Sequence, residues 1–274
     1  MNKYVVRLFF LFFLLVGFSS CSDFQRVMKS DNIDEKYQAA AKYYEKGDYY
    51  KAGMLLEELI PILRGRSEAE RAQFMYANSH FAQKQYLLAA YYFKTLYETY
   101  PRGEFAEEAQ FLQARSLYYD SPRYYLDQSS TVDAMAAFQS FIEKNPNSRF
   151  APQADSLYND LAVKIERKSY ENAKLYHGLR QYKSAVVALG NFLRDYPASP
   201  YAEEVAFLRI DSQLELAKAS VPERQAERYD EVIDFYLQFI DKYPQSKQLR
   251  AAEQRYAQAM EQVQRLKVSS LNKP

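Results

Sequence analysis

The residues that could take part in chemistry are few in this chain and far apart. Among 274 residues there are 2 histidines, His80 and His177, and 1 cysteine, Cys21. Neither histidine has a cysteine or carboxylate at the spacing of a metal site. The sequence also lacks a serine in a nucleophile elbow and a glycine-rich phosphate loop. We therefore predict a protein that is not an enzyme and that binds no cofactor and no metal.

Three pairs of adjacent glutamates could in principle act as a general acid and a general base. They are Glu57-Glu58, Glu107-Glu108 and Glu203-Glu204. Each pair falls on the polar face of a predicted amphipathic helix, where charged side chains usually face water. We interpret these carboxylates as solvated surface charge.

Cys21 follows a segment with the pattern of a signal peptide. Lys3 and Arg7 precede an apolar run from Leu8 to Phe18, and Ser19-Ser20 stand directly before the cysteine. A run of about 11 residues is shorter than the roughly 20 needed to span a bilayer as a helix. We expect residues 1–20 to be removed. A lone cysteine after two small residues resembles the lipobox of bacterial lipoproteins, which implies a lipidated Cys21 at the mature N-terminus and a polar tether over 21–32.

One helical pattern recurs along the rest of the chain. Alignment on Pro101, Pro146, Pro197 and Pro244 brings a set of apolar residues into the same register in each copy. The matched sets are Tyr86, Ala89, Phe93 and Leu96; Thr131, Ala134, Phe138 and Phe141; Tyr182, Ala185, Leu189 and Phe192; and Tyr229, Val232, Tyr236 and Phe239. An earlier copy, with Ala52, Leu56 and Leu59, has Arg64 in place of the proline. This spacing predicts amphipathic helices that end before proline.

A second helix with a small central residue precedes each copy. The small residues are Ala40, Ala77, Ala114 and Ala173. Paired helices with small contact residues are typical of tetratricopeptide repeats. We predict an all-α, right-handed superhelical solenoid of about five helix pairs with a C-terminal capping helix. The expected divisions are repeats 1–3 over 33–148, repeats 4–5 and the cap over 149–266, and a disordered tail over 267–274. The helix after Ala151 is expected to be either continuous or broken near Lys168.

Repeat geometry predicts where such a protein binds its partners. The first helix of each pair lines the concave surface of a solenoid, which suits an extended peptide or a helix. The candidates for a peptide groove are Tyr37, Tyr44, Phe74, Asn78, Phe81, Phe111, Arg115 and Tyr118. Any one of these aromatic residues could instead be buried between repeats.

Charge gives no indication of a nucleic-acid partner. The chain has 36 Lys and Arg against 35 Asp and Glu, and removal of residues 1–20 leaves a net charge of −1. A local excess of cations begins at Lys164 and ends at Lys183. This basic run could form the rim of a site for an acidic partner or simply a solvated face.

Several segments together resemble the BamD family, the lipoprotein subunit of the outer-membrane β-barrel assembly machinery. They are the lipobox, SPRYYLDQS inside the third pair, FQSFIEKNPNSRFAPQA after it, and GLRQYKSAVVALGNFLRDYPASPYAEEV. The resemblance covers nearly the whole chain. It implies a scaffold anchored in the outer membrane and facing the periplasm, with C-terminal repeats that hold BamA. It also implies N-terminal repeats that recognise unfolded outer-membrane proteins by a C-terminal strand ending in an aromatic residue. Other Bam lipoproteins are possible further partners.

The resemblance also assigns roles to single residues. Arg123 and Asp127 of the inserted loop would brace the third pair, and Arg180 and Arg194 would lie in the region of BamA contact. The chain departs from many members of the family at Ala188, where an arginine is common. We expect the contact at that point to be rearranged or absent.

Two other functions remain open on the sequence. Another periplasmic tetratricopeptide-repeat lipoprotein, coordinating cell-wall or envelope-constriction proteins, would share the signal and the solenoid but would not need the inserted loop. A nutrient-binding lipoprotein of glycan uptake would be expected to be longer and to carry tryptophan platforms. This chain has no tryptophan, which favours the periplasmic interpretations.

Overall fold

The structure, a computed structural model, describes residues 23–271, and every regular element in that range is a helix. The helices follow one another as α2 (Ile33–Glu45), α3 (Tyr49–Ile62), α4 (Ala69–Ala82), α5 (Tyr86–Thr99), α6 (Ala106–Asp120), α7 (Ser129–Lys144), α8 (Ala151–Gly178), α9 (Tyr182–Asp195), α10 (Ala202–Lys218), α11 (Pro222–Lys242) and α12 (Leu249–Leu271). The all-helical prediction is confirmed. The predicted signal segment and Cys21 lie outside the described residues.

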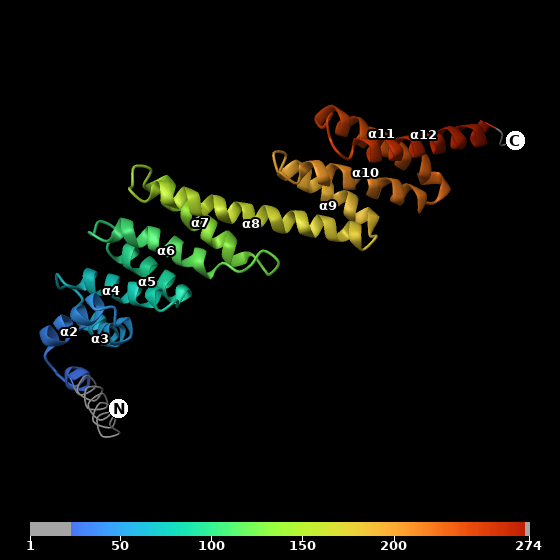
Figure 1. Cartoon of the computed structure of the whole chain (residues 1–274). Coiled ribbons are helices and arrows are strands. Elements are labelled where there is room, and N and C mark those ends of the chain that lie inside the picture. The colour runs from blue at the N-terminus through green and yellow to red at the C-terminus, as the bar shows by residue number, and fades with distance from the viewer. Residues whose placement is uncertain (1–22, 272–274) are drawn as a thin grey trace, which may run out of the picture. The chain divides into compact units, whose positions relative to one another are not determined.

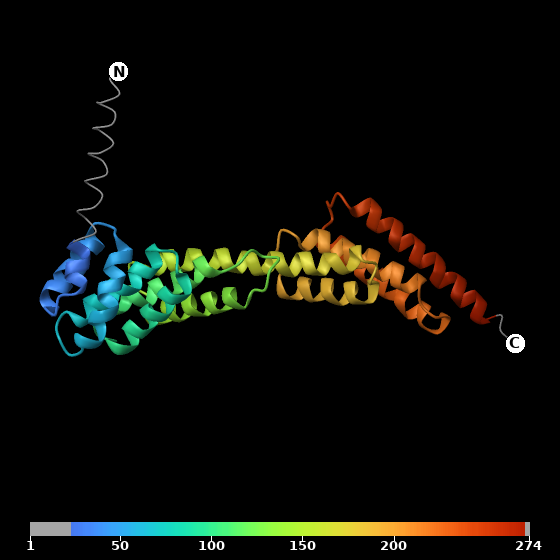
Figure 2. The ribbon, with the colours of Figure 1, turned by 90° about the horizontal axis from the view of Figure 1, so that it is seen from below.

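The helices form two compact units, with the boundary between Ala162 and Val163, inside α8. In the first unit each helix packs on the next one along the chain, from α2 to α7, as the blue-to-green ribbon shows in both views (Figure 1, Figure 2). In the second unit α9, α10, α11 and α12 pack in the same sequential way, and α12 also contacts α10. Packing between sequence neighbours is the arrangement expected of a tetratricopeptide-like solenoid.

Most of the apolar residues that the sequence pattern predicts on the second helices are buried in the hydrophobic cores. Ala89, Phe93 and Leu96 of α5 are fully buried. The matching residues of the other copies are buried as well: Ala52, Leu56 and Leu59; Ala134, Phe138 and Phe141; Ala185, Leu189 and Phe192; Val232 and Phe239. Tyr86, Tyr182 and Tyr236 are the exceptions, since they are half-buried, and Tyr236 stacks on Tyr256 of α12.

The four aligned prolines end their helices through the residue before them. Tyr100, Asn145, Tyr196 and Tyr243 are the C-caps of α5, α7, α9 and α11, with φ between −131° and −123° and ψ between 57° and 65°. The proline ring disfavours helical angles at the preceding residue, so each helix stops at the same point of the repeat.

A second recurring feature is the tight turn inside three of the pairs. Gly47, Lys84 and Arg180 have φ of 77°, 62° and 58°, and each directly follows the end of a first helix. The sequence predicts this left-handed residue at Gly47, where a glycine adopts it without steric cost. At Lys84 and Arg180 a residue with a side chain takes the same conformation.

The first helices approach their neighbours through the predicted small residues. Ala40, Ala77 and Ala114 are fully buried, and Ala173 is nearly so. The helix after Ala151 is continuous as far as Gly178, with no break at Lys168. The last helix also exceeds its prediction, because α12 runs to Leu271 where the sequence suggests a disordered tail from 267.

The segment predicted as a polar tether is folded in its described part. Residues 23–28 are helical, and Phe24 and Val27 are buried in the first core cluster. The Phe24 ring meets Tyr43 edge to face, with centroids 5.6 Å apart. These two apolar residues, three apart on one helical face, explain why the segment packs on α2 instead of remaining in solvent.

Within residues 23–271, no helix combines the length and the apolar character that a membrane span requires.

Candidate functional site

Three of the predicted groove residues belong to the packed interior. Tyr37 is 8% exposed and Phe111 is 1% exposed. Phe111 stacks on Phe150 at 4.8 Å, and Phe74 stacks on Phe105 at 4.6 Å, so both link a helix pair to the loop that follows it. The prediction of a ligand-facing surface is wrong for Tyr37 and Phe111, because their rings are needed between neighbouring helix pairs.

The other five candidates are half-buried on the first helices of the first unit. Tyr44 of α2 and Asn78 of α4 meet through a hydrogen bond of 2.5 Å from the Asn78 amide to the Tyr44 hydroxyl. Burial raises the pKa of Tyr44, so this phenol stays neutral. Tyr118 donates to Asp160 of α8 at 3.3 Å. Hydrogen bonds between side chains thus join α2 to α4 and α6 to α8.

Between these contacts lies an aromatic cluster around one cation. The Arg115 guanidinium carbon is 5.5 Å from the centroid of Phe81 and 5.7 Å from that of Tyr119. Tyr86 stacks on Tyr119 at 5.3 Å, and Tyr119 is 46% exposed. We call Phe81, Tyr86, Arg115, Tyr118 and Tyr119 the aromatic surface. Tyr86 and Tyr119 were not among the groove residues predicted from the sequence. Adjacent residues of a helix point about 100° apart, so the pair Tyr118-Tyr119 could have indicated that one ring is half-buried and the other exposed.

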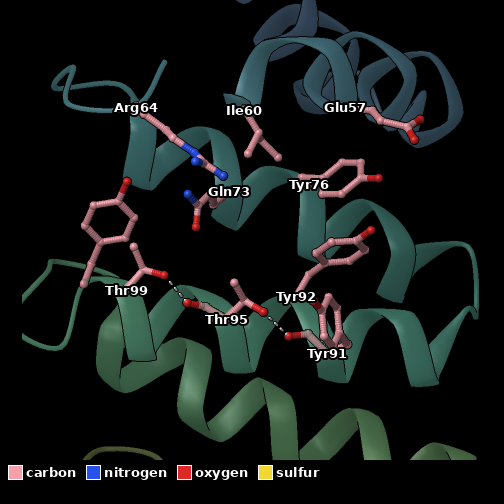
Figure 3. A pocket seen from close by; sticks show the side chains of 10 residues that line it. Glu57, Ile60, Arg64, Gln73, Tyr76, Tyr91, Tyr92, Thr95 and Thr99 are labelled. Carbon is pink, nitrogen blue, oxygen red and sulfur yellow. Dashed lines mark hydrogen bonds between the residues drawn. The ribbon is translucent and has the colours of Figure 1, made fainter. Parts of the chain in front are cut away.

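A cavity of about 620 Å³ opens on another side of the same unit, between α3, α4 and α5 (Figure 3). Its walls carry Glu57, Ile60, Arg64, Gln73, Tyr76, Tyr91, Tyr92, Thr95, Thr99 and Tyr100. Gln73 and Tyr76 lie on a face of α4 different from that of Asn78 and Phe81, as the 100° per residue of a helix requires. Burial, and then the neighbouring Tyr92, raise the pKa of Tyr76 well above its ordinary value. The spacing of Tyr91, Thr95 and Thr99 could have indicated this face.

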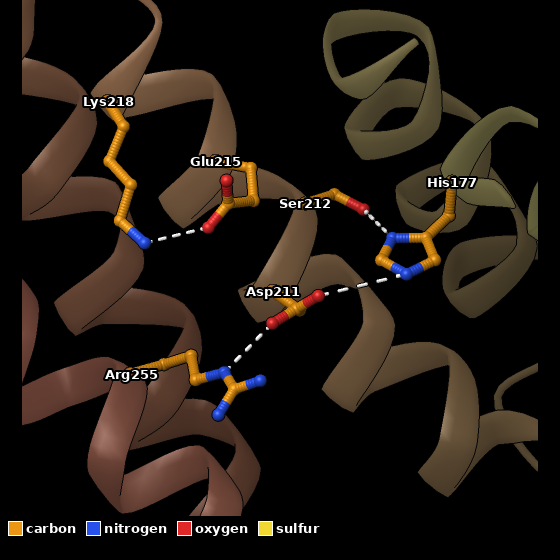
Figure 4. Close-up of polar contacts among 6 residues, drawn as sticks. All are labelled: His177, Asp211, Ser212, Glu215, Lys218 and Arg255. Carbon is orange, nitrogen blue, oxygen red and sulfur yellow. Dashed lines mark hydrogen bonds and ion pairs between the residues drawn. The ribbon is translucent and has the colours of Figure 1, made fainter. Parts of the chain in front are cut away.

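In the second unit both ring nitrogens of His177 have polar neighbours within the fold (Figure 4). His177 Nδ1 lies 2.9 Å from the Ser212 hydroxyl, and its Nε2 lies 3.7 Å from Asp211. Asp211 also accepts a hydrogen bond from Arg255 of α12 at 2.8 Å. Ser212 is fully buried, so a substrate cannot reach its hydroxyl. These residues tie α8, α10 and α12 together, and the resemblance to a Ser-His-Asp triad is one of residue types only.

Two of the three glutamate pairs brace neighbouring helix pairs, whereas Glu57 and Glu58 are exposed and Glu58 contacts only Lys36 of its own helix pair among the ion pairs of residues 23–271. Glu107 accepts from Ser148 and Glu203 accepts from Ser246, each at 2.6 Å, across about one repeat of sequence. Glu204 accepts from Lys174 at 2.6 Å and from Tyr170 at 2.8 Å. Purely solvated charge is therefore the wrong interpretation of these two bracing pairs. Among residues 23–271, no cluster of three or more His, Cys, Asp or Glu side chains is arranged to hold a metal ion.

The inserted loop is held chiefly by a residue that the resemblance did not single out. Gln128 is 6% exposed, and its amide donates to the carbonyls of Arg123 at 2.8 Å and Leu126 at 3.1 Å. Asp127 accepts from the backbone N–H of Ser129 at 2.9 Å, which caps the start of α7. The Arg123 side chain is exposed and reaches Tyr125 in the same loop.

The two arginines predicted to contact BamA lie in different structural environments. Arg180 is exposed in the left-handed turn before α9. Arg194, near the end of α9, lies beside a cavity of about 270 Å³ between α9, α10 and α11. The sequence pattern of α9 does not indicate that cavity, because its other two cations, Arg209 and Lys242, belong to α10 and α11.

A sequence of paired helices with matching cores and matching proline-terminated ends defines a helical-repeat protein of the tetratricopeptide type. Comparison with known proteins identifies it further. The family model YfiO, described as outer membrane lipoprotein, matches residues 29–182 and 163–269, so the chain belongs to this family of outer membrane lipoproteins.

Two curated relatives carry matching names. The chain is 23% identical over 247 residues to the "Putative outer membrane protein assembly factor BamD" of Aquifex aeolicus, covering 88% of this chain and 80% of that protein. It is 29% identical over 84 residues to the "Outer membrane protein assembly factor BamD" of Helicobacter pylori, covering 31% of this chain and 38% of that protein.

Proposed function

We propose that this chain is a scaffold of the β-barrel assembly machinery, anchored in the outer membrane by lipid on Cys21 and facing the periplasm. Its function is to bind a BamA-type barrel protein and to help recognise and insert nascent outer-membrane proteins. Membership of the outer membrane lipoprotein family, with relatives named as BamD assembly factors, is the observation that carries this proposal.

The aromatic surface supports a role in substrate recognition. Rings of Phe81 and Tyr119 flank the Arg115 guanidinium at less than 6 Å. Aromatic faces pack against the rings of an incoming peptide, and an arginine pairs with a terminal carboxylate. An extended segment that ends in an aromatic residue presents both groups together. Tyr44 and Asn78, which are also half-buried on the first helices, would contact the polar backbone of such a segment.

Affinity purification of the tagged full chain from membranes tests the proposal. We expect the wild-type chain and Arg115→Gln to recover equal amounts of a BamA-type barrel protein, since the barrel contact is assigned to the second unit. Arg115→Gln should recover at most about a tenth as much unfolded outer-membrane protein, because a hydrogen bond to a charged group contributes about 1.5–3 kcal/mol. Arg102→Gln, at an exposed loop residue outside the aromatic surface, is the control.

Recovery of cell-wall or envelope-constriction proteins without any barrel protein would contradict this function and favour the other periplasmic scaffold. Equal recovery of unfolded substrates by wild type and Arg115→Gln would remove the aromatic surface from the proposal and leave the barrel contact in place.

A further inference from the structure

The cavity between α9, α10 and α11 gathers positive charge without a matching acid. Its walls carry Gly190, Leu193, Arg194, Ala206, Arg209, Phe235, Gln238, Phe239, Lys242 and Tyr243. Three of these ten side chains are cationic and none is a carboxylate. We call this the cationic pocket. The nearest acids that contact or act on these cations, Asp195 and Glu231, are not among the wall residues, so the wall itself presents only positive charge.

Arg209 is the central group of the cationic pocket. Its guanidinium carbon lies 3.7 Å from the centroid of Phe235, and the same group lies 3.4 Å from the place where a Cβ would stand at Gly190. Its Nε is buried and has no hydrogen-bond partner among residues 23–271. Burial lowers the pKa of Arg209, and Glu231 acts in the opposite direction. Glu231 itself accepts a hydrogen bond from Gln213 at 2.5 Å.

A second wall residue also has an unsatisfied polar atom. The Tyr243 hydroxyl is buried and has no hydrogen-bond partner in the part of the chain that the structure describes. Buried polar groups in folded proteins are almost always hydrogen-bonded, and each exception calls for an explanation. Two unsatisfied groups, Arg209 Nε and Tyr243 Oη, belong to one pocket of three helices. Both can donate, so the chemistry that would satisfy them is that of an acceptor.

The other two cations are placed at the accessible side of the pocket. Arg194 has a side chain 70% exposed, and it donates to Asn191 and Asp195, both at 3.0 Å. Lys242 donates to the carbonyl of Pro197 at 3.0 Å, which leaves its other N–H groups available. These two residues can attract an anion from solution, whereas Arg209 and Tyr243 can bind it at the bottom.

We propose that the cationic pocket binds the carboxylate of an Asp or Glu side chain presented by a partner polypeptide. A carboxylate matches the planar edge of a guanidinium, and Phe235 holds that guanidinium by its face so that the edge stays available. The volume of about 270 Å³ suits one inserted side chain and lies below the range of most small-molecule sites. This inference goes beyond the proposed function, since it specifies the chemistry of a contact whichever polypeptide supplies the acid.

Site-specific photocrosslinking in cells tests the proposal with the full chain. Benzoylphenylalanine replaces Gln238, an exposed residue of the pocket wall, and the crosslinked peptide is sequenced by mass spectrometry. We expect a discrete adduct whose partner peptide contains Asp or Glu. Arg209→Met, which keeps an apolar stem on Phe235, should lower the adduct yield at least about tenfold, because loss of one member of a buried charge pair is costly.

The matched control is Arg224→Met, since Arg224 lies on α11 with the crosslinker position, outside the pocket, in an exposed pair with Glu227. It should leave the adduct unchanged. Arg194→Gln, at an exposed side chain that folding does not require, should lower the yield by a smaller factor. Arg209→Glu should abolish the adduct, and the reverse substitution of the identified acid in the partner should restore it.

Three results would overturn the proposal: no adduct from the wild-type chain, an adduct peptide without an acidic residue, or equal yields from wild type and Arg209→Met. The partner's identity bears on the separate question of function. An acidic peptide from a barrel protein agrees with the proposed function, whereas one from a cell-wall protein keeps the cationic pocket and contradicts the proposed role in barrel assembly.

Discussion

The two units of this chain share one buried register but have different exposed chemistry. In the first unit α4 and α6 meet through aromatic rings, as in the contact of Phe81 with the exposed Tyr119. In the second unit the corresponding region contains charges, including Asp211, which binds both His177 and Arg255. Phe141 and Phe192 nevertheless occupy the same repeat position and are equally buried.

This difference teaches that the repeat pattern and the binding surfaces are separable properties of the sequence. Apolar residues at the repeat positions give each helix pair its core, and those positions have little freedom. The half-buried positions beside them can carry rings or cations without disturbing that core. Aromatic side chains therefore form the surface that we propose for a ring and a terminal carboxylate in the first unit, and cations form the pocket that we propose for an acidic side chain in the second unit.

The strongest test of the shared register is removal of one core ring from each unit. Phe141→Ala and Phe192→Ala should each lower the free energy of unfolding by about 3–5 kcal/mol, the usual cost of an emptied ring site. Denaturation followed by helical circular dichroism measures the loss, and hydrogen exchange locates it. We expect faster exchange in α6 and α7 for the first variant, and in α9 and α10 for the second.

Val187→Ala is the control, because Val187 is on α9 but 59% exposed. Its effect should stay below about 0.5 kcal/mol. If either ring variant accelerated exchange equally in both units, the chain would unfold as a single cooperative block, and the division into two units would fail as a description of stability.

A smaller effect is expected at the left-handed turns, where the two units use different residues. Arg180→Gly should stabilise the second unit by about 0.5–1 kcal/mol, since glycine adopts φ near 60° without strain. Gly47→Ala should destabilise the first unit by about 1 kcal/mol through backbone strain alone, because its added Cβ would meet no atom closer than 4.0 Å. Thermal unfolding of both variants measures these changes, and shifts of the same sign would contradict the shared turn.

The smallest effect concerns pH. Burial acts to raise the pKa of Glu204, but hydrogen bonds from Lys174 and Tyr170 outweigh it and hold that pKa below its ordinary value. Hydrogen bonds to Glu204 and Tyr170 raise the pKa of Lys174. The stabilisation by Glu204 is therefore present above the unfolded pKa of about 4.3 and is lost as pH falls through the folded value. That of Lys174 is present below about pH 10 and is lost as pH rises through its own raised value.

Glu204→Gln should cost only about 0.5 kcal/mol near neutral pH, because more than a third of each side chain of this pair is exposed. Its stability should also decline less between neutral and acidic pH than that of wild type. Denaturant titrations at several pH values measure both effects. Glu107→Gln is the comparison from the first unit, where the partner is the uncharged Ser148 hydroxyl. An unchanged acid dependence in Glu204→Gln would show that the brace is not ionic.

Much of the fold could be predicted because its signals are local. Apolar spacing and the residue before each proline determine where α5, α7, α9 and α11 begin and end. The burial of Phe24 and Val27 could not be predicted, because the surrounding sequence is polar and two apolar residues are too few to establish a helical periodicity. The continuity of α8 follows from the lack of any proline or glycine between Pro152, in its first turn, and Gly178.

The surfaces were less predictable, because burial depends on the neighbouring helix pair. Phe111 and Arg115 lie four apart on one helix, yet the first is packed against Phe150 and the second lies beside exposed Tyr119. Arg209 and Lys242 are 33 residues apart and belong to one pocket only after α10 and α11 pack together. No spacing rule within a single helix could have joined them.

The folded segment before α2 limits how far the first helix pair can stand from the membrane. Only three residue steps separate Cys21 from Phe24, whose ring is already fixed in the core. A fully extended chain of that length reaches about 11 Å. With acyl chains on Cys21, the N-terminal helices would work at the level of the lipid headgroups, close to where an emerging barrel first meets the bilayer.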